Sequence, residues 1–226
     1  MSHYLCLSKE TVEQVEQFDY LMLRVSNCLS WESHITKLCQ RTHSRISLSN
    51  RISLFLPKPV LLSIYKQTIL PILDYCSTVW YDCGSTLTRR IELVQYRAMR
   101  IILQVGKKTC TQEMRNELKL LTLLNRRFFR FVLIFKILNN LDCPEQLLGI
   151  FKFRRSVRNR GLRDETLLDL PKVKTRMGQT MFAYAGEKDW NSLPVHIRHL
   201  STITILKHTL FKYLLDCDNH NHVCSL

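Results

Sequence analysis

The densest group of side chains able to do chemistry is a basic run at residues 151–163, FKFRRSVRNRGLR. Guanidinium groups fork onto phosphate oxygens, and aromatic rings such as Phe151 and Phe153 can stack on unpaired bases. The run has no acidic residue and holds six cations: Lys152, Arg154, Arg155, Arg158, Arg160 and Arg163. It predicts a nucleic-acid contact; the alternative is a solvated basic linker that repels itself and stays extended.

A second group of cations follows a helical spacing. Arg90, Arg97 and Arg100 flank an apolar stripe with steps of three and four residues, made of Leu87, Ile91, Val94, Ala98, Ile101 and Val105. This periodicity predicts an amphipathic helix that Gly106 ends as a C-cap. Its cationic flank suits a helix lying along a nucleic-acid backbone, and the alternative is a set of solvated arginines.

Residues for catalysis or metal binding are sparse. A two-metal polymerase needs carboxylates close together, and the sequence has no aromatic-x-Asp-Asp motif. Asp74 is interpreted as a cap or turn residue. Cys217, His220, His222 and Cys224 suit zinc by type, but their spacing is not standard and they lie at a terminus. We therefore predict no catalytic residue, no metal ligand and no cofactor for this chain.

Charge and composition bound the class of protein. The 226 residues carry a formal net charge of +14, with 46% hydrophobic and 23% charged residues. Residues 1–50 are neutral overall, whereas residues 151–226 carry a net charge of +6. These values exclude a wholly disordered chain, and only 6 glycines favour helices over a β-sandwich.

The cysteines and the hydropathy pattern bear on the compartment. The nine cysteines are odd in number, widely spaced and without a CxxC motif, which favours free thiols in a reducing environment. No stretch of about 20 apolar residues occurs, and the first ten residues do not read as a signal peptide. We predict a cytoplasmic or nuclear protein that is not secreted and does not contact a membrane.

The remaining pattern predicts the elements that would position the two cationic groups. Residues 12–25 predict a strand buried on both sides. Helices are expected at 30–47, after Pro59 until Pro71 bends or ends the helix, and at 118–139, where a nearly all-apolar sequence indicates a core helix. A linker at 140–165 and a smaller unit follow, with a helix or turn at 180–190 and an amphipathic helix at 202–215.

Several blocks, in one collinear order over residues 15–215, resemble the segment that follows the polymerase palm in non-LTR (LINE-type, jockey-like) retrotransposon reverse transcriptases. They are FDYLMLRVSNCLSWESHI (18–35), LLSIYKQTILPILDYCSTVW (61–80), IELVQYRAMRIIL (91–103), LLTLLNRRFFRFVLIFKILNN (120–140) and TRMGQTMFAYAGEKDWNSLPVHIR (175–198). The chain departs from the family pattern at Met22, at 161–163, and at Glu187, where the family has alanine.

The resemblance implies a mainly α fold: a helical thumb-like bundle, a short N-terminal β element left from the palm and a small C-terminal helical unit. The expected division is 1–30 palm edge, 31–140 thumb-like domain, 141–165 basic linker and 166–226 C-terminal extension. The family's catalytic palm, for which Mg²⁺ is implied, would precede this segment. The resemblance therefore assigns polymerase activity to no residue of this chain. The expected function is non-catalytic binding of RNA or an RNA/DNA hybrid. The alternative is a degenerate or domesticated helical protein-interaction module.

Overall fold

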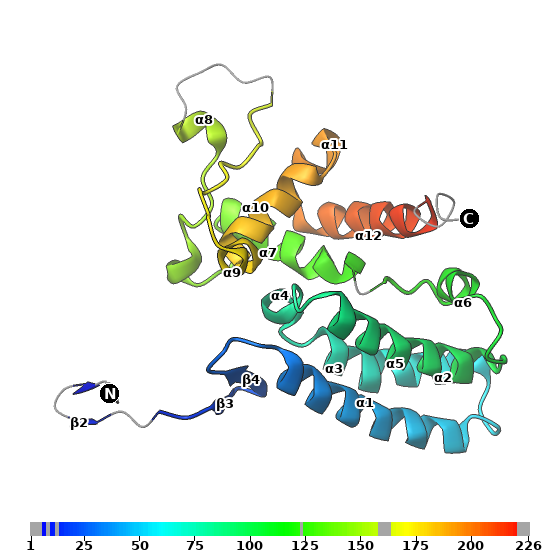
Figure 1. Cartoon of the computed structure of the whole chain (residues 1–226). Helices are drawn as coiled ribbons and strands as arrows, with labels where there is room; N and C mark the ends of the chain where they lie inside the picture. The colour runs from blue at the N-terminus through cyan, green and yellow to red at the C-terminus, as the bar shows by residue number, and fades with distance from the viewer. Residues whose placement is uncertain (1–5, 8–9, 12–13, 123, 158–163, 221–226) are drawn as a thin grey trace.

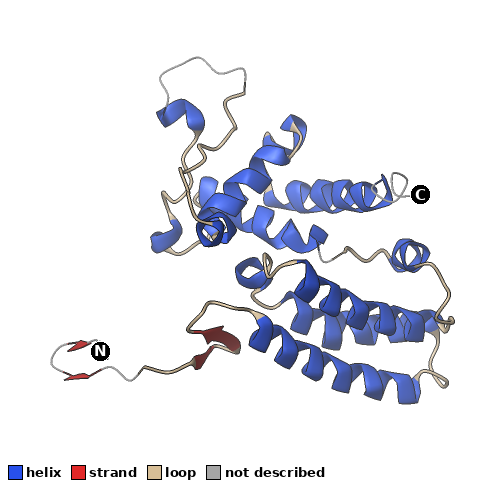
Figure 2. Cartoon of the chain, viewed as in Figure 1, coloured by secondary structure: helices blue, strands red, loops and turns tan. Residues whose placement is uncertain are grey.

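The structure is a computed structural model that describes residues 6–7, 10–11, 14–122, 124–157 and 164–220. Helices dominate, and the strands are short and confined to the N-terminal part of the described chain (Figure 2). The predicted mainly α fold with an N-terminal β element is thus confirmed. The helices lie in two groups, α1 to α6 below and α7 to α12 above in the view of Figure 1.

The N-terminal β element consists of two hairpins. Strand β1 (Cys6–Leu7) pairs with β2 (Glu10–Thr11), and β3 (Gln17–Tyr20) pairs with β4 (Leu23–Ser26), all antiparallel. The prediction of one strand over 12–25, buried on both sides, is wrong.

The chain reverses at Leu21 and Met22, whose φ angles of 45° and 69° are those of a two-residue hairpin turn. The apolar run that suggested burial is left largely in solvent, and Phe18 is 59% exposed. Apolar composition therefore did not report burial in this segment.

The lower group of helices surrounds one apolar core. It contains α1 (Glu32–Ile52), α2 (Lys58–Ile64), η1 (Tyr65–Ile69), α3 (Leu70–Asp74), α4 (Ser77–Trp80), α5 (Ser85–Leu103) and α6 (Thr111–Leu118). Its fully buried side chains include Ile35, Ile46, Leu73, Trp80 and Ile91. The predicted helix at 30–47 corresponds to α1, which runs further than expected.

Helical structure continues through Pro71 instead of ending there. A proline has no N–H to donate and its ring crowds the preceding turn. The turn before it widens into the π-helix η1, in which the Leu70 N–H donates to the carbonyl of Tyr65, and helical structure continues to Asp74. A π-turn of this kind absorbs the local mismatch while keeping Tyr65 and Ile69 in the core.

Helix α5 ends earlier than the sequence predicts. Gln104, and not Gly106, takes the left-handed conformation after Leu103, with φ of 57°. Its side-chain Nε2 donates to the carbonyl of Ser53 at 2.9 Å, which offsets the strain of a non-glycine residue in that conformation. The predicted C-cap at Gly106 is therefore wrong.

The upper group has its own core. It comprises η2 (Leu124–Arg127), α7 (Phe128–Leu138), η3 (Glu145–Leu147), α8 (Arg154–Val157), α9 (Arg176–Thr180), α10 (Phe182–Ser192), α11 (Val195–Arg198) and α12 (Ile203–His220). Leu206, Leu210 and Leu214 form the buried stripe of α12, while Phe131, Ile134 and Phe135 face it from α7. The helices predicted at 180–190 and 202–215 correspond to α10 and α12.

The predicted single helix over 118–139 is wrong. Lys119 takes a left-handed conformation (φ 51°) and caps α6, and α7 begins only at Phe128. Helix α7 packs on α10 and α12, whereas the division expected from the sequence places it with the preceding helices. Gly186 makes this packing close, because a Cβ there would lie 3.2 Å from Ile134 Cδ1.

Candidate nucleic-acid interface

Helix α5 turns one row of side chains to solvent. Arg89, Leu93 and Arg97 are exposed at steps of four residues, while the opposite side of the helix is buried in the lower core. Two arginines of the predicted cationic flank, Arg90 and Arg100, are therefore half-buried rather than exposed. We call Arg89, Arg90, Arg97 and Arg100 the α5 arginine face.

Arg90 is half-buried and held by helix α1. Its Nη2 donates to Thr36 Oγ1 at 3.1 Å, and its Nη1 lies 4.0 Å from Glu32 Oε1. Arg100 is also half-buried, and its Nε has no hydrogen-bond partner among the described residues. Of the three predicted arginines, only Arg97 is fully presented to solvent.

Two open hollows flank this row. One, of about 380 Å³, lies between α1 and α5 and is lined by His43, Arg90 and Leu93. The other, of about 680 Å³, reaches from α5 toward α9, and its lining includes Tyr81, Arg89, Leu93 and Tyr96. The larger hollow is also lined by Asp82 and Glu92, which disfavour a phosphate inside it. The exposed cations beside Leu93 therefore suit a strand whose phosphates follow the row of arginines rather than enter this hollow.

The basic run is only partly within the described residues. Arg158, Arg160 and Arg163 lie outside them. Arg154 and Arg155 open the short helix α8, and Arg155 Nη1 forms an ion pair with Glu165 Oε2 at 2.5 Å. Because both partners of this pair are exposed, a phosphate could replace the carboxylate at little cost.

The described part of the basic run is anchored rather than free. Phe151 is buried against Phe182, with ring centroids 5.4 Å apart, so it does not offer a face to bases. Phe153 forms a β-bridge with Leu168, and the Arg154 N–H donates to the carbonyl of Leu167 at 2.8 Å. Phe151 is thus unavailable for the stacking suggested by the sequence, and residues 151–154 are held by backbone and core contacts rather than extended in solvent.

The two cationic groups belong to different parts of the fold. The α5 arginine face stands on the lower core, and α8 lies on the upper group, at the top of the view in Figure 1. The described members of the basic run, Lys152, Arg154 and Arg155, therefore do not share one patch with the α5 arginine face.

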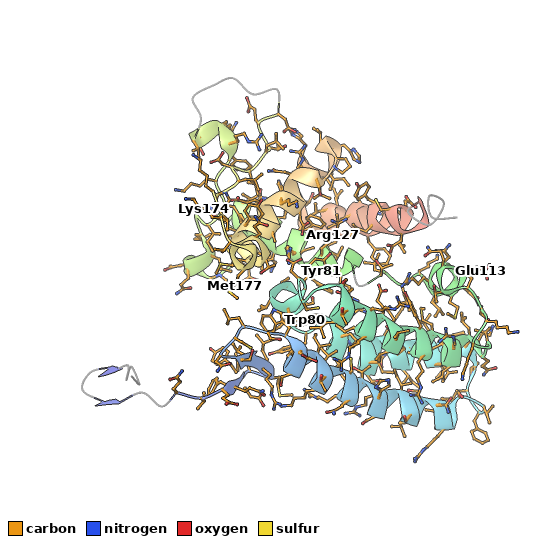
Figure 3. The ribbon with its side chains drawn as sticks, viewed as in Figure 1. Trp80, Tyr81, Glu113, Arg127, Lys174 and Met177 are labelled. Carbon is orange, nitrogen blue, oxygen red and sulfur yellow. The ribbon has the colours of Figure 1, made fainter. Side chains whose placement is uncertain are left out.

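A third set of arginines was missed as a group by sequence reasoning. Arg126, Arg127 and Arg130, the junction arginines, lie where the upper and lower groups meet. Arg130 is 2% exposed and bridges Asp82, at 3.1 Å, and Asp189, at 2.9 Å. Arg127 Nη1 lies 3.6 Å from Asp189 as well, and Figure 3 shows it beside Tyr81.

Asp74, interpreted as a turn residue, ends α3 and also belongs to this junction. Its Oδ1 lies 2.8 Å from Arg126 Nη1. Burial raises the pKa of Asp74, and the nearby Arg126 opposes the shift. Burial likewise raises the pKa of Tyr81 to about 12. Charged pairs taken out of water in this way position the elements that carry them. The only sequence signal for them is arginines within an otherwise apolar run.

Other chemistry is not assembled in the part of the chain that the structure describes. No group of three or more His, Cys, Asp or Glu able to hold a metal ion occurs there. Of the zinc-like tail, His222 and Cys224 fall outside the described residues. The seven cysteines from Cys28 to Cys217 are free thiols. Within the described residues, every helix is too short or too polar to cross a bilayer.

Comparisons with known proteins gave no relatives. No family model, no curated protein and no solved structure matches this chain.

Proposed function

We propose that this chain binds single-stranded RNA or an RNA/DNA hybrid without catalysing a reaction on it, as a non-catalytic C-terminal part of a non-LTR retrotransposon reverse transcriptase. The observation that carries the proposal is the α5 arginine face with a hollow on each side. The net charge of +14 supports it, because a surplus of cations attracts a polyanion from any direction.

The chemistry of the interface predicts how binding should behave. Phosphate contacts by arginine are independent of base sequence, and each one releases a counterion from the strand. Binding should therefore weaken steeply with salt and vary little between sequences. Leu93, which is exposed beside the cations, would add an apolar contact that salt does not screen, whereas the ring of Tyr96 is already covered by the guanidinium of Arg115.

The test is the salt dependence of binding to a single-stranded oligoribonucleotide, measured by fluorescence anisotropy. The double variant Arg89→Ala/Arg97→Ala should flatten the slope of log K against log salt by about 1.4, at about 0.7 for each phosphate that is no longer neutralised. The matched control is Arg41→Ala/Arg45→Ala, which removes the same charge from exposed positions of α1 outside both hollows. If the slope falls equally in both variants, RNA binding depends on overall positive charge and not on the α5 arginine face.

The basic run is tested separately. Replacing Arg154, Arg155, Arg158 and Arg160 by alanine should flatten the slope by roughly 3 if each engages a phosphate. An unchanged slope in a folded quadruple variant would confine binding to the α5 arginine face.

One observation favours the alternative, a helical protein-interaction module. Hairpin β3–β4 exposes Phe18, Tyr20, Leu21 and Met22 together, which is an unusual concentration of apolar surface for a short segment. Absence of measurable RNA binding by the unmodified chain at about 50 mM salt would decide for that alternative.

A further inference from the structure

A separate pocket opens at the junction of the two groups of helices, and the α5 arginine face does not contribute to it. It has a volume of about 240 Å³ and receives side chains from η1, α3, α5, the segment after α6, η2, α7 and α12. This volume lies below the roughly 300–1,000 Å³ typical of sites for drug-sized ligands, so it suits a ligand with one ring system.

One wall of the pocket is aromatic. Phe128, Phe129 and Phe211 line it, and Phe128 contacts each of the other two edge-to-face, with centroids 5.5 and 6.4 Å away. Phe129 is 40% exposed, although it is one of the largest apolar side chains of α7. A planar ring can pack on this exposed face without displacing a core residue.

The pocket is also lined by a buried cation, Arg126, whose hydrogen-bond donors are not all paired. Arg126 is 3% exposed, and one of its terminal nitrogens faces Asp74 at 2.8 Å. Its other terminal nitrogen, Nη2, has no hydrogen-bond partner among the described residues. This nitrogen is closed to solvent, so Arg126 contributes positive charge to the pocket rather than an accessible hydrogen-bond donor.

The rim adds positive charge. Lys66 and Lys119 line the pocket and are exposed, so three cations face one carboxylate, that of Asp74. Lysine at a rim suits a phosphate as a point-charge contact. The remaining lining includes Leu70, Leu120 and Leu121, which leaves no second carboxylate to repel an anion.

We propose that this pocket binds one nucleotide, with the base against Phe129 and its neighbours and the phosphate between Lys66 and Lys119, beside the buried positive charge of Arg126. The nucleotide could be a free nucleoside monophosphate or an unpaired residue of an RNA strand, and both present the same chemistry. Binding here does not require the α5 arginine face to bind RNA.

The test uses the full chain and adenosine 5′-monophosphate as the probe, followed by saturation-transfer difference NMR. The base protons should receive saturation, and titration should show a saturable affinity. Phe129→Ala should weaken binding at least about fivefold, as expected when one stacking ring is removed. Lys66→Gln/Lys119→Gln should weaken it by a similar factor, while the control Arg41→Ala/Arg45→Ala should leave it unchanged.

Two further measurements distinguish a free nucleotide from a strand residue and test specificity. The first uses an oligoribonucleotide that contains a single 2-aminopurine. If its fluorescence changes with the unmodified chain but not with Phe129→Ala, and free nucleotide does not bind, the ligand is an unpaired residue of a strand. Ribose 5-phosphate binding as well as the nucleotide would overturn the aromatic part of the site. Absence of both nucleotide binding and a Phe129-dependent fluorescence change would overturn the proposal, whatever the α5 variants show. All these substitutions are at exposed positions, so thermal melting should confirm intact folding.

Discussion

The α5 arginine face and the junction arginines use the same side chain for opposite purposes. On α5, Arg97 stands in solvent and Arg89 beside an open hollow. At the junction, Arg130 is enclosed between Asp82, Asp189 and the ring of Tyr81, which lies 4.6 Å from its guanidinium carbon. The count of arginines in a sequence therefore says little about binding until each one is placed.

The difference is one of desolvation. A guanidinium in water can exchange water for phosphate with little change in its own solvation, so it is available to a ligand. A guanidinium removed from water is held by its carboxylates, and removing Arg130 leaves the largely buried Asp189 with only the longer contact to Arg127. Substitutions at the two places should thus separate stability from binding.

The largest effect is expected for Arg130→Ala. Loss of the bridge between Asp82 and Asp189 should lower the free energy of unfolding by about 3–5 kcal/mol, the usual cost of breaking a buried pair from one side. Urea denaturation followed by circular dichroism measures it. A loss below about 1 kcal/mol would place Arg130 with the solvated arginines and remove the contrast.

A smaller effect, dependent on pH, is expected at Glu187. This side chain is buried, its Oε2 has no hydrogen-bond partner among the described residues, and burial together with Asp169 raises its pKa to about 7. Glu187 is therefore a buried carboxylate with which no arginine of the described residues pairs, whereas Asp189 pairs with Arg130.

The sign follows from the raised pKa. The folded state holds the proton more tightly than the unfolded state, so this residue lowers stability as pH rises from about 4.5 toward 7. Glu187→Gln should remove that loss and become more stable than the unmodified chain by about 1–3 kcal/mol at pH 8, with little difference at pH 4. If the free energy of unfolding changes with pH in the same way in both proteins, the raised pKa of Glu187 is contradicted.

How far the sequence predicted these features depends on the range of the interactions. The apolar stripe of α5 and the Leu206, Leu210 and Leu214 repeat of α12 are local patterns, and both helices are present, although their ends differ from the prediction. Local patterns do not report which segment a charged residue meets. Arg130 and Asp82 are 48 residues apart, so their pairing could not be anticipated.

The candidate site was predicted in part for the same reason. Helical spacing placed Arg90, Arg97 and Arg100 on one flank, and Arg97 does face solvent, but the contact of Arg90 with Thr36 depends on how α1 and α5 pack. The burial of Phe151 depends on α10, more than twenty residues further along the chain. The turn at Leu21 and Met22 could not be predicted, because neither residue type signals a left-handed conformation.

Arg90 should fall between the two extremes. It is half-buried, with one hydrogen bond to Thr36 and a long ion pair to Glu32. Arg90→Ala should lower the free energy of unfolding by about 0.5–1.5 kcal/mol, the usual range for one such hydrogen bond. It should also weaken RNA binding. Arg90→Lys would sharpen the comparison by keeping the charge. Recovery of RNA affinity without recovery of stability would show that the two roles are separable in one residue.

The smallest effect on stability, and the clearest effect on binding, is expected for Arg97→Ala. The side chain is exposed and no carboxylate of the described residues pairs with it, so the free energy of unfolding should change by no more than about 0.5 kcal/mol. Because the variant neutralises one phosphate fewer, the slope of log K against log salt for single-stranded RNA should flatten by about 0.7, equally for all sequences.

The control is Arg45→Ala, at an exposed position of α1. It removes the same charge away from both hollows and should leave the slope nearly unchanged. If Arg97→Ala destabilised the fold as Arg130→Ala does, exposure would not separate the two sets of arginines. If it left both stability and slope unchanged, the RNA contact would lie elsewhere than on the α5 arginine face.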